Sequence, residues 1–182
     1  MLKHLGKLGS LALAFLLTSQ ARAQANPTAE AQTAFQIGGG YSFSDPDYGH
    51  RYIQGLSIFG DYDVYRWHVG AEAEAHFLTL STPENTSEKS YFVGPRAFLR
   101  YKKKVKFYGK ALIGIGDLSI DPKANGGRTG GTNFAYGAGG GIDYMATHHL
   151  AIRVVDVEFQ KWNYLSGLTP VTYTFGAAYR FR

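Results

Sequence analysis

Six charged side chains of both signs stand inside segments that otherwise alternate apolar with small or polar residues. They are Glu72, Glu74, Arg96, Lys110, Arg153 and Glu158. Paired carboxylates can serve general acid–base chemistry, whereas carboxylates beside Arg and Lys can neutralise one another in a buried salt-bridge network. If the segments that carry them pair as a hairpin, Glu72 and Glu74 lie across the ladder from Arg96 or Arg100. We favour the structural network, because an unpaired ion in a dry interior is strongly destabilising.

Other side chains of chemical interest do not form a recognisable site in the sequence. His50, His76 and Ser90 are of the types that hydrolytic or acyl-transfer chemistry uses, but no His-x-Ser pair occurs. The adjacent histidines at 148–149 point apart on an extended backbone, which disfavours a metal site. Residues 126–131, GGRTGG, lack the Gly-Lys-Ser/Thr ending of a phosphate-binding loop. We therefore expect no catalytic residue, no cofactor and no metal ligand.

The N-terminal segment has the three parts of a secretory signal. Basic residues open the chain, residues 8–17 form an apolar run, and residues 21–23, Ala-Arg-Ala, give the small-residue cleavage pattern. The apolar run is too short to span a bilayer as a helix. We expect residues 1–23 to be a signal peptide and residues 24–32, QANPTAEAQ, to be a flexible periplasmic lead-in.

The composition favours a single β-domain. The 13 Tyr, 12 Phe and 23 Gly suit β-structure, because aromatic side chains fit a pleated surface and glycine marks turns or close backbone approach. The chain has no cysteine, so an exported domain must be stable without disulfides. The net charge of +5 falls to +2 once Lys3, Lys7 and Arg22 of the signal are removed, which indicates no nucleic-acid partner.

Period-two alternation predicts eight strands. They cover residues 34–43, 52–62, 67–77, 93–100, 105–115, 134–144, 150–160 and 171–181. In the seventh segment the parity slips, which predicts a β-bulge near Val154–Val155. The bulge would put Arg153, Asp156, Glu158 and Gln160 on one face.

The connections between these segments alternate in length. Long polar or Gly-rich connections at 45–51, 81–90, 116–133 and 161–170 follow the first, third, fifth and seventh strands, and tight turns follow the others. Strands of about ten residues, with long loops at one end and short turns at the other, are typical of barrels that cross a bilayer.

Three features place the polar face inside the barrel and the apolar face in lipid, against a soluble barrel with an apolar cavity. Glycine crowds the polar face, as expected where eight strands close on a narrow interior. Charges of both signs on that face can neutralise one another. Aromatic residues gather near the strand ends of the apolar face, as in interfacial girdles: Phe43, Tyr62, Trp67, Phe77, Tyr101, Phe107, Phe134, Tyr144, Tyr173 and Phe181.

Two stretches resemble the outer-membrane β-barrel domain family, the OmpA/OmpX-like and opacity-type group of eight-stranded porin-family proteins. One is residues 136–144, YGAGGGIDY, followed after a short turn by HLAIR at 149–153. The other is residues 174–181, TFGAAYRF, which looks like a terminal strand recognised by the barrel-assembly machinery. In that signal Gly176, Tyr179 and Phe181 carry the resemblance.

The resemblance implies an all-β, eight-stranded antiparallel transmembrane up-and-down β-barrel over residues 33–182, in the cell outer membrane. Its implied partners are outer-membrane lipid, lipopolysaccharide and the assembly machinery. We expect a monomeric, non-enzymatic protein with a structural or surface-interaction role, in adhesion or envelope integrity. An extracellular ligand would bind the long loops, which contain Tyr48, Trp162 and Tyr164; Trp162 could equally anchor at the headgroups. The alternatives are a lipid A-modifying barrel enzyme and a narrow pore.

Overall fold

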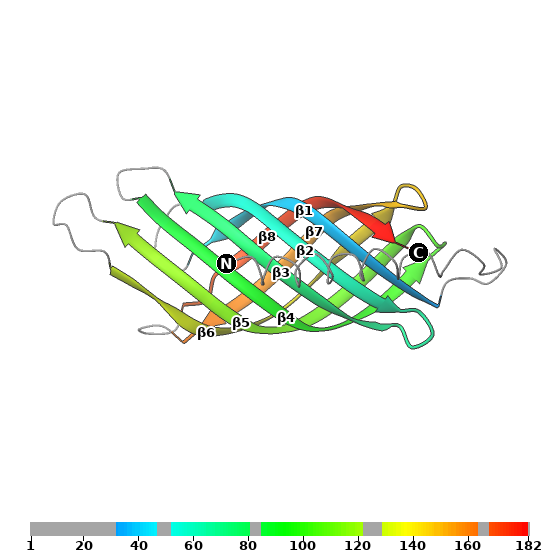
Figure 1. Cartoon of the computed structure of the whole chain (residues 1–182), viewed down its shortest axis with the longest axis horizontal. Coiled ribbons are helices and arrows are strands. Elements are labelled where there is room, and N and C mark those ends of the chain that lie inside the picture. Colours follow the sequence, from blue (N-terminus) through cyan, green and yellow to red (C-terminus); the bar gives the residue numbers. More distant parts are fainter. Residues whose placement is uncertain (1–31, 47–51, 81–84, 122–128, 164–167, 182) are drawn as a thin grey trace, which may run out of the picture. The chain divides into compact units, whose positions relative to one another are not determined.

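The computed structural model describes residues 32–46, 52–80, 85–121, 129–163 and 168–181. Eight antiparallel strands close into one barrel in which each strand pairs with its neighbours in sequence and β1 pairs with β8 (Figure 1). The strands are β1 Thr33–Asp45, β2 Ile53–Val64, β3 Val69–Leu80, β4 Asn85–Tyr101, β5 Val105–Asp121, β6 Thr129–Met145, β7 Leu150–Trp162 and β8 Val171–Phe181. The predicted all-β, eight-stranded fold is confirmed.

The predicted signal peptide, 1–23, and all but the last residue of the predicted lead-in, 24–32, lie outside the described residues. Within the described part of the chain, no helix is long and apolar enough to span a membrane.

Closure of the barrel depends on the pairing of the first and last strands. Phe35 pairs with Phe181 at one end of this ladder and Asp45 pairs with Val171 at the other. Because β1 also pairs with β2 from Thr33 to Ser44, both edges of β1 are occupied along almost its whole length. A closed sheet leaves no strand edge with unpaired backbone groups, which is the condition for a sheet to exist in lipid.

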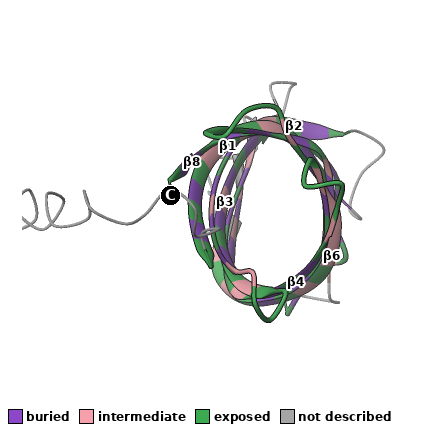
Figure 2. Cartoon of the chain, turned by 90° about the vertical axis from the view of Figure 1, so that its right-hand side faces the viewer, coloured by how far each residue is buried: buried purple, intermediate pink, exposed green. Residues whose placement is uncertain are grey.

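Side chains alternate between a buried interior and an exposed apolar outer wall, which Figure 2 shows as alternating purple and green along the ribbons. In β1 the buried residues are Ala34, Gln36, Ser42 and Ser44, whereas Phe35, Ile37, Tyr41 and Phe43 are exposed. All ten aromatic residues that the sequence placed on the outer face are exposed. The wall is therefore apolar over a continuous belt, as lipid contact requires.

The predicted bulge in β7 is confirmed by the register with β6. Ile142 pairs with Val155 and the next residue, Asp143, pairs with Arg153, so Val154 is the extra residue. The ladder with β8 shifts at the same place, between Arg153 and Asp156. The bulge lets Arg153 and then Asp156, Glu158 and Gln160 point inward, because it resets the parity by one.

Three strands, β4, β5 and β6, are much longer than predicted. The expected loops 81–90 and 116–133 are wrong, because β4 begins at Asn85, β5 ends at Asp121 and β6 begins at Thr129. The expected loop 161–170 also begins too early, since β7 runs to Trp162. In these extensions the outer side chains turn polar or small while the backbone ladder continues, so the alternation that predicts strands disappears although the pairing does not.

The two ends of the barrel differ. We call the end with the connections 65–68, 102–104 and 146–149 the turn end; Thr33 and Phe181 also lie there. The other end, with 46–52, 81–84, 122–128 and 163–170, is the loop end. Trp67, predicted in the third strand, lies in the first of the turns and is 70% exposed. The connections 46–52, 122–128 and 163–170 are longer than the turns, as predicted, but 81–84 is no longer than 65–68 or 146–149, so the predicted alternation of lengths is wrong at that connection.

Candidate functional site in the barrel interior

All six charged residues singled out in the sequence lie buried inside the barrel: Glu72, Glu74, Arg96, Lys110, Arg153 and Glu158. Strands β3, β4, β5 and β7 supply them, at positions where the period of two turns the side chain inward. Further buried charges surround them. We call Asp61, Asp63, Glu72, Glu74, Arg96, Lys106, Lys110, Asp143, Arg153, Asp156 and Glu158 the lumenal charge network.

Two guanidinium groups form the centre of this network. Arg96 Nη1 lies 2.6 Å from Asp61 Oδ1 and 3.1 Å from Glu72 Oε2. Arg153, on β7, contacts the same two carboxylates. Its Nη1 lies 2.8 Å from Glu72 Oε1 and its Nη2 lies 3.3 Å from Asp61 Oδ2. Arg153 Nε also lies 3.4 Å from Asp143 Oδ1. Planar guanidinium groups suit this position, because their several N–H donors can contact several carboxylates at once.

A single lysine, Lys110, forms ion pairs with the carboxylates nearer the loop end. Lys110 Nζ lies 2.8 Å from Glu74 Oε2, 3.0 Å from Asp156 Oδ1 and 3.1 Å from Glu158 Oε2. Glu72 Oε1 is 3.7 Å away. The partners come from β3 and β7, which are not neighbours of β5, so Lys110 bridges the lumen rather than one hairpin.

A second lysine occupies the turn-end side of the network. Lys106 Nζ lies 2.8 Å from Asp63 Oδ2, 3.2 Å from Asp143 Oδ2 and 3.5 Å from Asp61 Oδ1. The sequence reasoning left Lys106 and these aspartates out of its network. The alternation of the strand could have predicted the position of Lys106, because it stands four residues before Lys110 and so lies on the same inward face.

Arg100 does not pair with Glu72 or Glu74 as the hairpin argument allowed. Its guanidinium lies over the ring of Tyr65 at the turn end, 4.6 Å from the ring centroid. Arg180 Nη2 donates a hydrogen bond to the Tyr65 hydroxyl. Burial raises the pKa of Tyr65, and the positive charge of Arg180 opposes that shift.

Aromatic rings fill the space between the charges. The Arg153 guanidinium lies 3.6 Å from the ring centroid of Phe59, and Arg96 lies 4.1 Å from that of Tyr108. The Tyr108 hydroxyl donates a hydrogen bond to Asp156 Oδ2. Phe59 and Tyr108 are both buried, so cation–π contact supplements the ion pairs in a desolvated interior.

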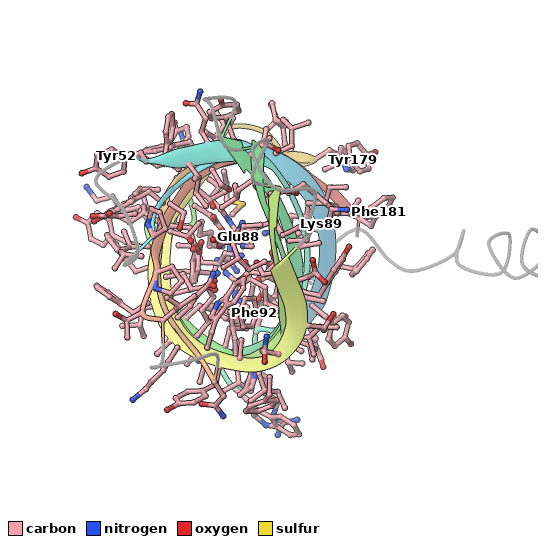
Figure 3. All side chains as sticks on the ribbon, turned by 90° about the vertical axis from the view of Figure 1, so that its left-hand side faces the viewer. Tyr52, Glu88, Lys89, Phe92, Tyr179 and Phe181 are labelled. Carbon is pink, nitrogen blue, oxygen red and sulfur yellow. The ribbon has the colours of Figure 1, made fainter. Side chains whose placement is uncertain are left out.

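Apolar side chains gather in the interior beneath the loop end. We call Phe92, Leu112, Leu118, Ala135 and Trp162 the rim cluster; all five are buried and pack together, with Leu168 against them. Figure 3 shows Phe92 and the buried Glu88 projecting into the barrel, whereas Tyr52, Tyr179 and Phe181 project outward. The barrel therefore buries apolar as well as polar side chains.

The prediction that Trp162 lies in a loop, as an exposed contact or a headgroup anchor, is wrong. It is only 1% exposed, and its indole Nε1 donates a 2.8 Å hydrogen bond to Gln160 Oε1. A Cβ built on Gly116 would come 2.5 Å from the indole ring, so the ring needs a glycine opposite it. Glu158 and Gln160 were predicted to face inward, and continuing the strand by two residues would have placed Trp162 on the same inward face.

Two of the histidine and serine candidates lie together, since His76 pairs with Ser90 across β3 and β4. His76 and Ser90 are both buried in the lumen, and His50 lies outside the described residues. His76 Nδ1 lies 3.3 Å from Ser42 Oγ, and His76 Nε2 lies 3.8 Å from Glu74 Oε1. The order Ser, His, Glu resembles that of a nucleophile, base and orienting acid.

The histidine pair and the Gly-rich segment stay apart from this site. His148 and His149 are exposed at the turn end, where His149 Nδ1 lies 3.2 Å from the backbone oxygen of Arg180. Residues 126–128 lie outside the described residues, and Thr129 to Gly131 begin β6 rather than forming a loop.

The residues proposed as a C-terminal assembly signal lie on β8. Gly176 pairs with Gly40, and Tyr179 and Phe181 are exposed on the outer wall. The Tyr179 ring stacks on His149 at a centroid distance of 5.6 Å, and the Phe181 ring stacks on Phe35 at 5.6 Å. These contacts join the last strand to the aromatic girdle at the turn end.

A closed eight-stranded sheet with an apolar belt, aromatic girdles and a polar, ion-paired interior defines a transmembrane β-barrel. The chain belongs to the outer membrane protein beta-barrel domain family, whose model matches residues 10–181. Its location is the cell outer membrane.

Solved structures of outer-membrane proteins share this fold. Ail, the attachment invasion locus protein of Yersinia pestis, is 19% identical, with a TM-score of 0.61, over 82% of this chain and 99% of Ail. OprG from Pseudomonas aeruginosa is 14% identical, with a TM-score of 0.60, over 82% and 96% of the two chains. Neisserial surface protein A is 13% identical, with a TM-score of 0.55, over the same shares. No curated relative matches the sequence.

Proposed function

We propose that this protein is a monomeric, non-enzymatic barrel that presents its loop end outside the cell, for binding an extracellular ligand and for envelope integrity. One observation carries the proposal: three strands continue as a paired sheet beyond the apolar belt. As part of the same proposal, the barrel-assembly machinery recognises β8 through Gly176, Tyr179 and Phe181.

The end of the belt is visible in two adjacent rows of outward side chains. Tyr91 pairs with Ile115, and Ile115 pairs with Phe134, so these three make one apolar row across β4, β5 and β6. One step nearer the loop end, the paired row is Lys89, Asp117 and Thr132. A change from apolar and aromatic to charged and hydroxyl side chains marks the limit of the hydrocarbon.

The sheet does not stop at this limit. β4, β5 and β6 each have 17 residues, against 11 to 13 in the other strands, and they extend farthest at the loop end (Figure 1). At roughly 3.3 Å per residue, four further residues add about 13 Å along the strand. Such a projecting sheet is stiffer than a free loop, which lowers the entropy lost on binding a ligand.

A pore is less well supported than surface binding. The lumenal charge network and the rim cluster occupy successive levels of the interior, and their side chains contact one another across it. A lipid A-modifying enzyme is also less well supported, because Ser42 and His76 face the lumen and Ser42 is 0% exposed. Lipid lies on the other side of the wall. A change in lipid A acylation on expression of the protein, measured by mass spectrometry, would restore the enzyme hypothesis.

The test removes the projecting hairpin of β5 and β6 and keeps the barrel. Leu118 pairs with Gly131, so a variant that joins them by Asn-Gly in place of residues 119–130 shortens one hairpin without disturbing the register below. Ail has been solved with the heparin analogue sucrose octasulfate, which makes heparin a suitable first probe beside matrix proteins. We expect cells with the full-length protein to adhere to at least one coated surface and the shortened variant to lose that adhesion.

A matched control is Lys102→Ser, which changes an exposed residue at the turn end and should leave adhesion unchanged. If the full-length protein binds none of the probes, or if the shortened variant binds as well, the surface-binding role is wrong. Leakage of a periplasmic enzyme from a deletion strain then measures the envelope role separately.

A further inference from the structure

Three donor atoms from two strands face one another in the lumen. Glu74 and His76 lie on β3 and Glu158 lies on β7, and one ligand atom of each lies within 4.8 Å of the other two. All three side chains are buried. Glu74 and Glu158 belong to the lumenal charge network and His76 adjoins them on β3, and the proposed surface-binding function makes no use of this cluster.

Each of the three side chains has a polar atom with no hydrogen-bond partner among the described residues. These atoms are Glu74 Oε1, His76 Nε2 and both carboxylate oxygens of Glu158. His76 Nε2 lies 3.8 Å from Glu74 Oε1, which is too long for a hydrogen bond. Buried polar atoms are normally satisfied, and unsatisfied atoms on three side chains that face one another indicate a missing partner.

Each side chain also has an outer partner that orients it. Lys110 Nζ lies 2.8 Å from Glu74 Oε2 and 3.1 Å from Glu158 Oε2. Ser42 Oγ lies 3.3 Å from His76 Nδ1 and 2.7 Å from Thr174 Oγ1. This is the arrangement of a metal site, in which outer partners orient each ligand and leave its second atom for the metal.

The local charge also favours a cation. Among the described residues, Lys110 is the one Lys or Arg recorded within 4.0 Å of either Glu74 or Glu158, so two carboxylates share one ammonium group. The described interior as a whole buries eight carboxylates and five Lys or Arg side chains, an excess of three negative charges. A divalent cation at the cluster would remove most of this excess.

Two further hydroxyl groups flank the cluster. Ser57 and Ser90 pair with His76 from either side, on β2 and β4. Both are buried, and neither Oγ has a hydrogen-bond partner among the described residues. They could hold a water molecule that completes the coordination of a metal with three protein ligands.

We propose that Glu74, His76 and Glu158 bind one divalent first-row transition-metal ion, with Zn²⁺ the best match. Imidazole and carboxylate ligands both suit Zn²⁺, with bonds of about 2.0–2.2 Å. Tetrahedral bonds of that length put donor atoms roughly 3.4 Å apart, so the three side chains need to close by about an ångström. The ion would join β3 to β7 across the lumen and stabilise the barrel.

The experiment measures metal in the tag-free mature protein in detergent. The protein is refolded with or without Zn²⁺, passed over a desalting column, and its metal content is determined by mass spectrometry. We expect one Zn²⁺ per chain, and a higher midpoint of thermal unfolding for the loaded protein. Loading during refolding separates slow entry into a closed lumen from failure to bind.

Variants identify the ligands. His76→Gln and Glu158→Gln should each lower the affinity at least tenfold and abolish the thermal shift, whereas His149→Gln should change neither. Cu²⁺ loaded in place of Zn²⁺ should show coupling to one nitrogen in its electron paramagnetic resonance spectrum, and lose it in His76→Gln. The faster gel migration of unheated, folded barrels checks that each variant folds.

Two results would overturn the proposal. One is wild-type protein that retains less than a tenth of an equivalent of Zn²⁺ after refolding in its presence. The other is metal content that stays the same in His76→Gln and Glu158→Gln, which would mean adventitious binding at exposed histidines. Neither result would bear on adhesion, so the surface-binding proposal is tested independently.

Discussion

The lumenal charge network and the rim cluster fill the same barrel by different physical means. In the network, Arg153 contacts carboxylates on β2, β3 and β6, and its position depends on charge. In the rim cluster, Trp162, Leu112 and Phe92 pack by shape, with a single indole hydrogen bond. Ion pairs stabilise a desolvated interior only when every member has its partner, whereas apolar packing tolerates changes that conserve volume.

The difference shows where in the barrel interior ion pairs are suitable and where apolar packing is suitable. Charges can be matched only across the lumen, where several strands converge on one point. Nearer the loop end the wall includes the long strands β4, β5 and β6, and the flat indole of Trp162 packs on Gly116. Four substitutions would break or sharpen this contrast.

The largest effect is expected from Arg153→Met. This change leaves Asp61, Glu72 and Asp143 without one of their cations in a dry interior, and should cost about 3–5 kcal/mol in the free energy of unfolding. Urea unfolding in lipid vesicles measures it. Lys161→Met, on the exposed face of the same strand, is the matched control and should change stability by less than about 0.5 kcal/mol. An Arg153→Met loss under 1 kcal/mol would contradict the network's need for complete pairing.

Leu112→Ala should have the next largest effect, about 2–4 kcal/mol, because it opens a cavity in the rim cluster. Leu112→Met keeps the volume and should cost less than about 1.5 kcal/mol. In the network, by contrast, the conservative Arg153→Lys should recover little, since one ammonium nitrogen cannot take the separate positions from which Nε, Nη1 and Nη2 of Arg153 contact three carboxylates. The same urea experiment compares the four variants. Equal tolerance of both conservative changes would remove the distinction between the regions.

Gly116→Ala should cost about 1–3 kcal/mol by displacing the Trp162 ring. The intrinsic tryptophan emission should shift to longer wavelength as the indole is exposed. Gly109→Ala, whose Cβ would meet no atom closer than 3.8 Å, is the control and should leave the emission unchanged. An unshifted spectrum in Gly116→Ala would show that the ring does not depend on this glycine.

The smallest effect is expected in ion conductance. The wild-type lumen should pass almost no current in a planar bilayer, and Arg96→Ala should raise the leak by opening the centre of the network. Leu112→Ala should raise it less, because the cavity it leaves is lined by apolar groups that exclude hydrated ions. A large current through the wild-type protein would instead favour the narrow pore.

Much of the fold could be predicted from alternation because each strand has one face toward lipid and one toward the lumen. The bulge at Val154 was predictable from a single slip of parity, and it decides that Asp156 and Glu158 point inward. The loop-end parts of β4, β5 and β6 were not predictable in this way, because outside the membrane neither face of a strand needs to be apolar. Trp162 was predicted in a loop for a related reason, because Gln160, Lys161 and Asn163 around it are typical of a loop. Its position, two residues after Gln160, nevertheless fits the inward face of the strand.

The sequence by itself therefore determined the number of strands, which side chains face inward, and that charges of both signs meet in a closed interior. It did so because the period of two is a local property of each strand. Only the tertiary structure decided the partners: that Lys110 joins Glu74 to Glu158, and that Glu74, His76 and Glu158 converge on one point. These contacts cross the lumen between strands that are not neighbours, so their distances depend on the stagger and curvature of the whole barrel.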